Sequence, residues 1–73
     1  MTVQNSASEN ELERLSDRID KIEYIEQMLR ELRQIASGVD AATLTYLLEM
    51  SVIEAGDALK ARRQAGELLS QTK

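Results

Sequence analysis

The chain has 73 residues and a net charge of −4, with 42% hydrophobic, 30% charged and 3% aromatic residues. It contains no cysteine and no histidine, which excludes disulfides, thiol chemistry and ordinary zinc or haem ligation. With no proline and three glycines it also has too few turn signals for a small β domain. This composition is typical of long helices or coiled coil, so we expect an all-α protein.

The first helix is expected to follow a short tail. Residues 1–7 are polar and small and have no hydrophobic period, which predicts a disordered N-terminal tail. Ser8 and Glu11 have the spacing of a capping box, so the helix should begin at about residue 9 and continue over about 9–37. Gly38 is expected to take the left-handed conformation that ends a helix.

A short turn at 38–40 should lead into the second helix, which covers about 41–70. Asp40 is placed to cap that helix, and Val39 is placed to pack on Leu44 as a hydrophobic staple. A turn of this length makes the two helices antiparallel neighbours. We therefore expect residues 8–73 to form one helical hairpin.

The apolar residues predict which sides of the two helices meet. A mean spacing below 3.6 residues in the first helix predicts a left-handed supercoil. The expected contact residues of the first helix are Leu12, Leu15, Ile19, Ile22, Ile25, Leu29, Leu32 and Ala36. Those of the second helix are Leu44, Leu48, Ser51, Ala55, Ala58, Arg62, Ala65 and Leu69.

Folding the chain about Gly38–Val39 brings residue i near residue 78 − i, so that small residues of the second helix face large ones of the first. The same register sets Arg62 near Asp17. We expect the two side chains to form an ion pair, with the Arg62 stem on apolar surface and its head reaching solvent. The alternative is an unpaired Arg62 at the frayed end of the helix.

The most informative segment is 41–53, which has one charged residue, Glu49, among thirteen. A helix that is apolar most of the way round must be buried most of the way round, and one hairpin can cover only one side of it. We therefore expect a homodimer that forms a four-helix bundle, or else coverage by another protein. The residues expected at this interface are Met28, Ile35, Tyr46, Met50 and Ile53.

Charged residues otherwise indicate solvated helix surface. Asp17 with Lys21, and Glu26 with Arg30, have the i,i+4 spacing that stabilises a helix by about 0.2–0.5 kcal/mol per pair. The one basic cluster could contact an anion, but it has no interleaved aromatic residue, and the net negative charge disfavours nucleic acid and anionic membranes. This cluster consists of Lys60, Arg62 and Arg63.

No pattern supplies a catalytic pair. A nucleophilic Ser or Thr would need Lys, Asp or Glu as its base, and the Glu23 and Glu26 spacing lacks the histidines of helical metal sites. We expect no enzymatic activity, no cofactor and no small-molecule substrate. The start of the chain lacks the pattern of a secretion signal, and no run approaches about eighteen apolar residues, so we expect a cytoplasmic protein.

Two segments carry a resemblance. They are YIEQMLRELRQIA over 24–36 and LTYLLEMSVIEA over 44–55. Together they resemble a pattern in short, uncharacterised α-proteobacterial proteins. The resemblance covers about half of the chain and implies a bacterial, cytoplasmic helical protein, with no activity or binding residue attached.

Three functions remain open at this point. The first is a small non-enzymatic interaction or regulatory module that acts through self-association and a protein-binding surface. The second is a subunit or antidote that folds on a different protein through Tyr46, Met50 and Ile53. The third is a small DNA-binding regulator that uses Lys60, Arg62 and Arg63. A ribbon-helix-helix regulator is disfavoured because residues 2–7 have no base-reading Arg or Lys and the expected helices are about twice too long.

Overall fold

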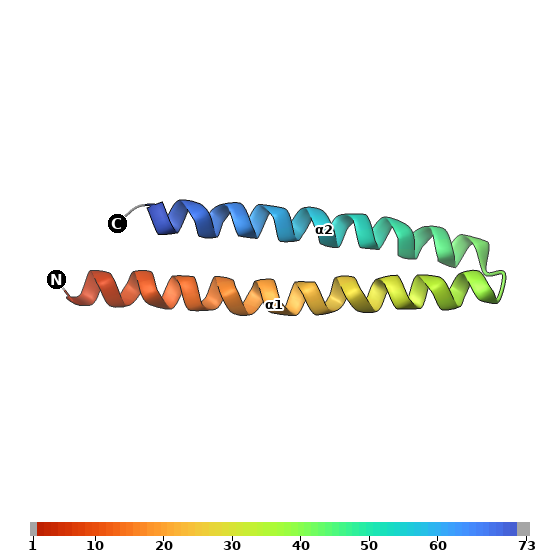
Figure 1. Ribbon diagram of the computed structural model, residues 1–73, viewed down its shortest axis with the longest axis horizontal. Coiled ribbons are helices and arrows are strands. Elements are labelled where there is room, and N and C mark those ends of the chain that lie inside the picture. Colours follow the sequence, from red (N-terminus) through yellow and green to blue (C-terminus); the bar gives the residue numbers. More distant parts are fainter. Residues whose placement is uncertain (1, 72–73) are drawn as a thin grey trace.

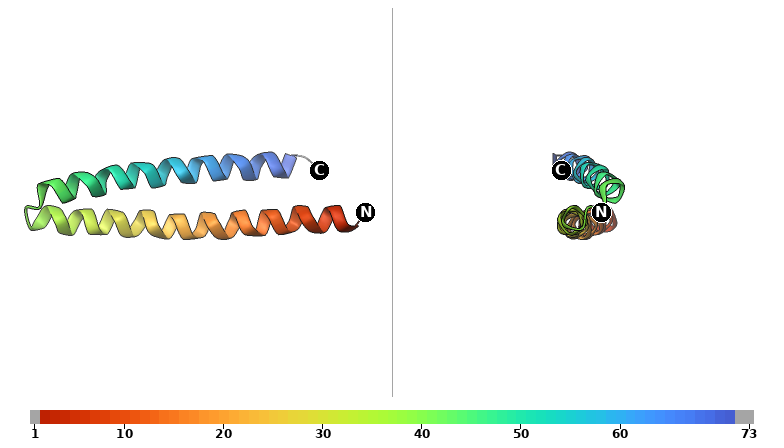
Figure 2. Two further views of the ribbon diagram at one scale, coloured as in Figure 1. Left: turned by 180° about the vertical axis from the view of Figure 1, so that it is seen from behind. Right: turned by 90° about the vertical axis from the view of Figure 1, so that its right-hand side faces the viewer.

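The protein is a helical hairpin. The computed structural model describes residues 2–71, and the side chains of residues 10–70 within them. Helix α1, Thr2–Gly38, and helix α2, Ala42–Gln71, run antiparallel and lie side by side (Figures 1 and 2). Residues 2–71 contain helix and turn but no strand, which confirms the all-α hairpin expected from the sequence.

The first helix begins earlier than expected. Its first residue is Thr2, so residues 2–7 are helical where a disordered tail was predicted, and the Ser8 and Glu11 pair does not mark the start. Residues 2–37 contain no glycine or proline that would stop the helix. Extending an existing helix by one residue costs far less than nucleating one, so α1 continues through this polar segment. In Figure 1 it extends past the end of α2.

The turn between the helices is a Schellman motif centred later than predicted. The Ala41 N–H donates to the Ala36 carbonyl at 3.1 Å, and the Asp40 N–H donates to the Ser37 carbonyl at 3.2 Å. These are the two hydrogen bonds of the motif, whose left-handed residue lies between Val39 and Ala41. That residue is Asp40, with a φ of 58°, whereas no glycine among residues 2–71 has a positive φ.

Three expectations for the turn are therefore wrong. Gly38 is the last helical residue of α1 and not its left-handed cap. Asp40 is not the N-cap of α2, because an N-cap residue has an extended conformation. Its place is taken by Ala41, whose carbonyl accepts the Thr45 N–H at 2.8 Å. The staple is not formed either, since Val39 is 69% exposed and Leu44 is 52% exposed.

The contact between the helices, called the seam below, follows an unbroken heptad pattern. Each helix has buried or half-buried residues in alternating steps of three and four. In α1 these are Leu12, Leu15, Ile19, Ile22, Glu26, Leu29, Arg33 and Ala36. In α2 they are Thr45, Leu48, Val52, Ala55, Leu59, Arg62, Gly66 and Leu69.

The seam differs from the predicted one by a rotation of each helix. Glu26 and Arg33 replace the expected Ile25 and Leu32 in α1, and four positions of α2 move by one residue. Those four changes put Thr45, Val52, Leu59 and Gly66 where Leu44, Ser51, Ala58 and Ala65 were expected. Ile25, Leu32 and Leu44 are thereby left beside the seam, whereas Val52 and Leu59 bring larger apolar side chains of α2 into it.

The register also differs from the predicted one. Arg33 faces Glu49, the position of a Cβ on Gly56 is close to Glu26, and that on Gly66 is close to Leu15. Residue i of α1 therefore lies about level with residue 82 − i of α2, and not with 78 − i, because the turn is centred on residues 39–41.

The expected pair of Arg62 and Asp17 is consequently wrong. Asp17 forms an ion pair with Lys21 at 3.1 Å on its own helix. Arg62 is half-buried in the seam and donates a hydrogen bond to the Ala58 carbonyl at 3.3 Å. The side chain thus finds its hydrogen-bond partner on its own helix.

The resulting molecule is a thin rod. The Cα extents are 59 × 15 × 11 Å and the radius of gyration is 16.8 Å, whereas a compact chain of this length has about 11 Å. Among the residues with described side chains, the buried apolar ones are Ala36, Ala55 and Leu59. One hairpin therefore has almost no interior.

Candidate interaction surfaces

One broad side of the hairpin is charged, and we call it the charged face. It is built from residues that directly follow seam residues in both helices, which lie on one side because the helices are antiparallel, together with the two charged seam residues Glu26 and Arg33. Arg63 of α2 pairs with Glu23 of α1, and Arg33 pairs with Glu49 at 3.7 Å. The expected pair of Glu26 and Arg30 is confirmed at 3.1 Å, on the same side. The charged face is Glu23, Glu26, Arg30, Arg33, Glu49 and Arg63.

The opposite broad side is apolar over the half of the rod near the turn, and we call it the apolar face. Each of its six residues directly precedes a seam residue. Ile25, Leu32 and Leu44 lie nearer to the seam, and the other three lie farther from it on the same side. Five of the six are 45% to 63% exposed, and Met28 is half-buried. The apolar face is Ile25, Met28, Leu32, Ile35, Leu44 and Leu47.

A second exposed apolar group lies on the outer side of α2, away from α1. At 100° per residue, Tyr46, Met50 and Ile53 are about 130° to 180° from the centre of the seam. Their exposed fractions are 57%, 41% and 54%. We call these three residues the outer stripe.

The five residues predicted at an interface thus divide between two surfaces. Met28 and Ile35 belong to the apolar face, whereas Tyr46, Met50 and Ile53 form the outer stripe. Sequence reasoning missed Ile25, Leu32 and Leu44, because it assigned them to the seam. Leu47 was missed as well, although its apolar neighbours in segment 41–53 were a signal for it.

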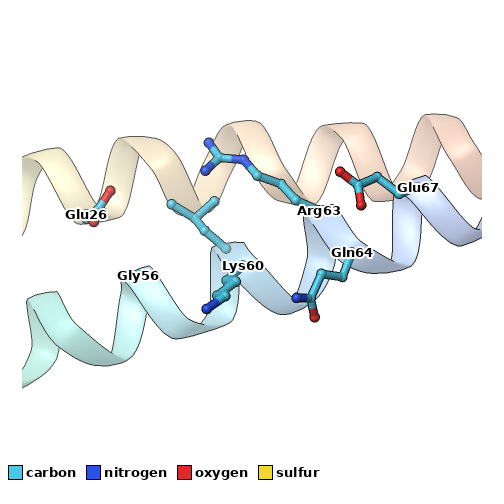
Figure 3. A pocket seen from close by; sticks show the side chains of 7 residues that line it. Glu26, Gly56, Lys60, Arg63, Gln64 and Glu67 are labelled. Atoms are coloured by element: carbon cyan, nitrogen blue, oxygen red, sulfur yellow. The ribbon is translucent and has the colours of Figure 1, made fainter.

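The predicted basic cluster does not form one patch. Arg63 is paired with Glu23 across the hairpin, and Arg62 is half-buried in the seam. Figure 3 shows the Arg63 side chain reaching toward α1 while Lys60 points away from it. The three cations therefore do not converge on a shared anion position.

The depressions on the surface are shallow. The one in Figure 3 is open to solvent and has both signs of charge on its rim, from Glu26, Lys60, Arg63 and Glu67. Among the described residues that line it there is no Ser, Thr or Cys nucleophile. It does not exclude water from any charged group, which is a condition that catalytic sites meet.

The described part of the chain has neither a metal-binding cluster nor a membrane-spanning helix. Within residues 2–71, whose side chains are described over 10–70, no group of three or more acidic side chains among those described could hold a metal ion. Over the same residues, neither α1 nor α2 has an apolar segment long enough to cross a membrane.

Comparison with known proteins gives no further assignment: the chain matches no protein-family model, no curated protein and no solved structure.

Proposed function

We propose that this protein is a non-enzymatic helical interaction module that acts by associating with a second copy of itself. The cytoplasm is its proposed location, in keeping with an acidic, cysteine-free composition. In this proposal the biochemical output comes from a surface and from the assembly that the surface forms.

The observation that supports the proposal is the amount of uncovered surface. The hairpin exposes 5856 Å², whereas a compact monomer of 8.2 kDa exposes about 4,500 Å². The excess of about 1,300 Å² exceeds the roughly 800 Å² that each partner buries in a standard protein interface. Large apolar side chains near the turn are among the exposed residues, and soluble monomers rarely expose large contiguous apolar patches.

Thermal unfolding over a wide range of protein concentration tests the proposal. If association stabilises the fold, the midpoint of unfolding followed by circular dichroism rises with concentration. The same scan with a charge-neutral crowding agent in place of more protein is the control, because crowding alone has a weak effect. A cooperative transition whose midpoint does not depend on concentration would overturn the proposal.

A second candidate is docking of a different protein on the outer stripe. Tyr46, Met50 and Ile53 remain exposed even if a second copy covers the apolar face, because they point away from it. Their i, i+4, i+7 spacing is that of helix positions which dock in an apolar groove. Cross-linking from a photoreactive group at Met50 tests this candidate. The candidate is supported if one partner protein is cross-linked from Met50 but not from the charged-face position Glu49. Equal cross-linking from both positions would contradict it.

A further inference from the structure

We propose that the apolar face is covered by a second copy stacked with both turns at the same end, so that α1 of each copy lies on α2 of the other. This inference rests on the proposed self-association and adds its surface and its orientation. The two copies are related by a two-fold axis along the rod, which keeps every residue at its own level.

The directions of the apolar side chains fit a bundle of four helices. In such a bundle each helix contacts two neighbours, so it needs two apolar sides that are roughly at right angles. In α1 the apolar-face residues lie about 75° to 130° from the seam, and in α2 Leu44 and Leu47 lie at a similar angle on the same side of the hairpin. The opposite flank of each seam is the charged face. A second hairpin can therefore stack on one side only.

The side chains that would meet are complementary in size. With residue i about level with residue 82 − i, Leu32 lies within one residue of the level of Ser51 of the second copy, and Ile25 within one residue of the level of Ala58. Ser51 and Ala58 are the small residues that directly precede seam residues of α2. Large residues of α1 thus face small residues of α2, which permits close packing of the two layers.

The half of this side that is far from the turn determines how the second copy is oriented. There α1 carries the exposed cations Lys21, Arg18 and Arg14, about level with Ala61, Ala65 and Leu68 of α2. Stacking with the turns at the same end lays the long stems of Lys21 and Arg18 on alanines and that of Arg14 on Leu68, and it leaves all three heads in solvent. Stacking two whole rods with the turns at opposite ends would instead press these cations onto Ile and Leu. The same-end arrangement therefore covers the apolar face and keeps these three cations off it. Glu54, which is exposed and directly precedes the seam residue Ala55 on this side, lies level with Met28, and in the proposed dimer its carboxylate points to the solvent edge of the contact.

Ile35 and Leu47 provide the test, because they lie level with each other across the proposed interface and are 63% and 55% exposed in the hairpin. I35K and L47E each put a charge into an apolar contact, and each should weaken self-association by about 100-fold or more. Mixing the two variants should restore a dimer, because one contact becomes Lys–Glu and the other keeps Ile–Leu. Both mass and helicity are measured, because a variant could be unfolded on its own and fold only when it is mixed with the other variant.

I53K is the matched control, since Ile53 is exposed to a similar extent but lies on the outer stripe. It should keep the mass and the dissociation constant of the native chain. Loss of the dimer in I53K, an unchanged dimer in I35K, or no heterodimer on mixing would each overturn the inference. A native chain that is itself monomeric would instead contradict the proposed function.

A separate measurement on the intact surface tests the orientation. The chain has no cysteine, and a Cβ at Gly38 meets nothing within 4 Å, so G38C gives one labelling site at the turn. Donor and acceptor dyes at this site should show efficient energy transfer in the proposed dimer. Low transfer in a confirmed dimer would show that the turns lie at opposite ends of rods that extend over 59 Å, and would overturn the orientation.

Discussion

The turn offers the sharpest test of the local structure. For one substitution there, the expectation from the sequence and the observed structure predict changes in stability of opposite sign. Gly38 is helical, and a Cβ there meets nothing within 4 Å. Gly38→Ala should therefore remove the cost of a helical glycine and stabilise the fold by about 1 kcal/mol. If Gly38 were the left-handed cap, the same substitution would destabilise the fold by about 1–2 kcal/mol.

Asp40→Gly is the counterpart at the residue that does have a positive φ. The left-handed conformation costs a residue with a side chain about 1–2 kcal/mol, and glycine has no such cost. Glycine also gives the unfolded chain more freedom, which opposes the gain by about 0.5–1 kcal/mol. The net effect should be a stabilisation of about 0.5–1 kcal/mol.

Both variants can be compared by thermal and urea unfolding followed by circular dichroism at one fixed protein concentration. A gain of 1 kcal/mol should raise the midpoint by about 4–8 °C in a domain of this size. A lower midpoint for Gly38→Ala would refute the Schellman motif with Asp40 as its left-handed residue.

Three further predictions concern the seam and the charged face. Leu59 is 3% exposed, so Leu59→Ala should lower the free energy of unfolding in urea by about 2–4 kcal/mol. The control Leu68→Ala, at a residue that is 63% exposed, should lower it by less than about 1 kcal/mol, and equal losses would contradict the assigned seam. A double-mutant cycle on Arg33 and Glu49 should give a coupling free energy below about 1 kcal/mol that falls with added salt, because both side chains are half-exposed. A coupling free energy that does not depend on salt would contradict this prediction. Gly56→Ala should stabilise the fold by about 1 kcal/mol because its Cβ would lie 3.5 Å from Glu26, an ordinary contact, and a loss of stability would mean that the helices are closer there.

The fold could be predicted from the sequence because its signals are redundant. The absence of proline, the heptad spacing of Leu12 to Ala36 and the short turn all indicate one antiparallel hairpin. Local ion pairs such as Asp17 and Lys21 could also be predicted, because they depend only on helical spacing.

The seam was harder to predict because each helix has two neighbouring apolar stripes. In α1, the choice between Ile25 and Glu26, or between Leu32 and Arg33, cannot be made from apolarity alone. A seam of Ile and Leu is favoured by transfer free energy within one chain. The structure instead puts polar residues in part of the seam, where Arg33 reaches Glu49, and leaves the larger apolar side chains outside.

The turn was mispredicted for a related reason. Gly38 is the residue type most often left-handed at a helix end, but Asp also tolerates that conformation. Ending α1 at Gly38 and turning at Asp40 moved the register from 78 − i to 82 − i, which is about one helical turn. The error of two residues at the turn therefore changed every expected contact between the helices.

The most direct test of the account is the mass of the native chain in solution at micromolar concentration, measured by light scattering or sedimentation. The account holds that one hairpin has more apolar surface than it can cover, so it predicts a particle of about 16 kDa, twice the 8.2 kDa of one chain. A helical, cooperatively folded particle of 8.2 kDa that does not grow with concentration would contradict it.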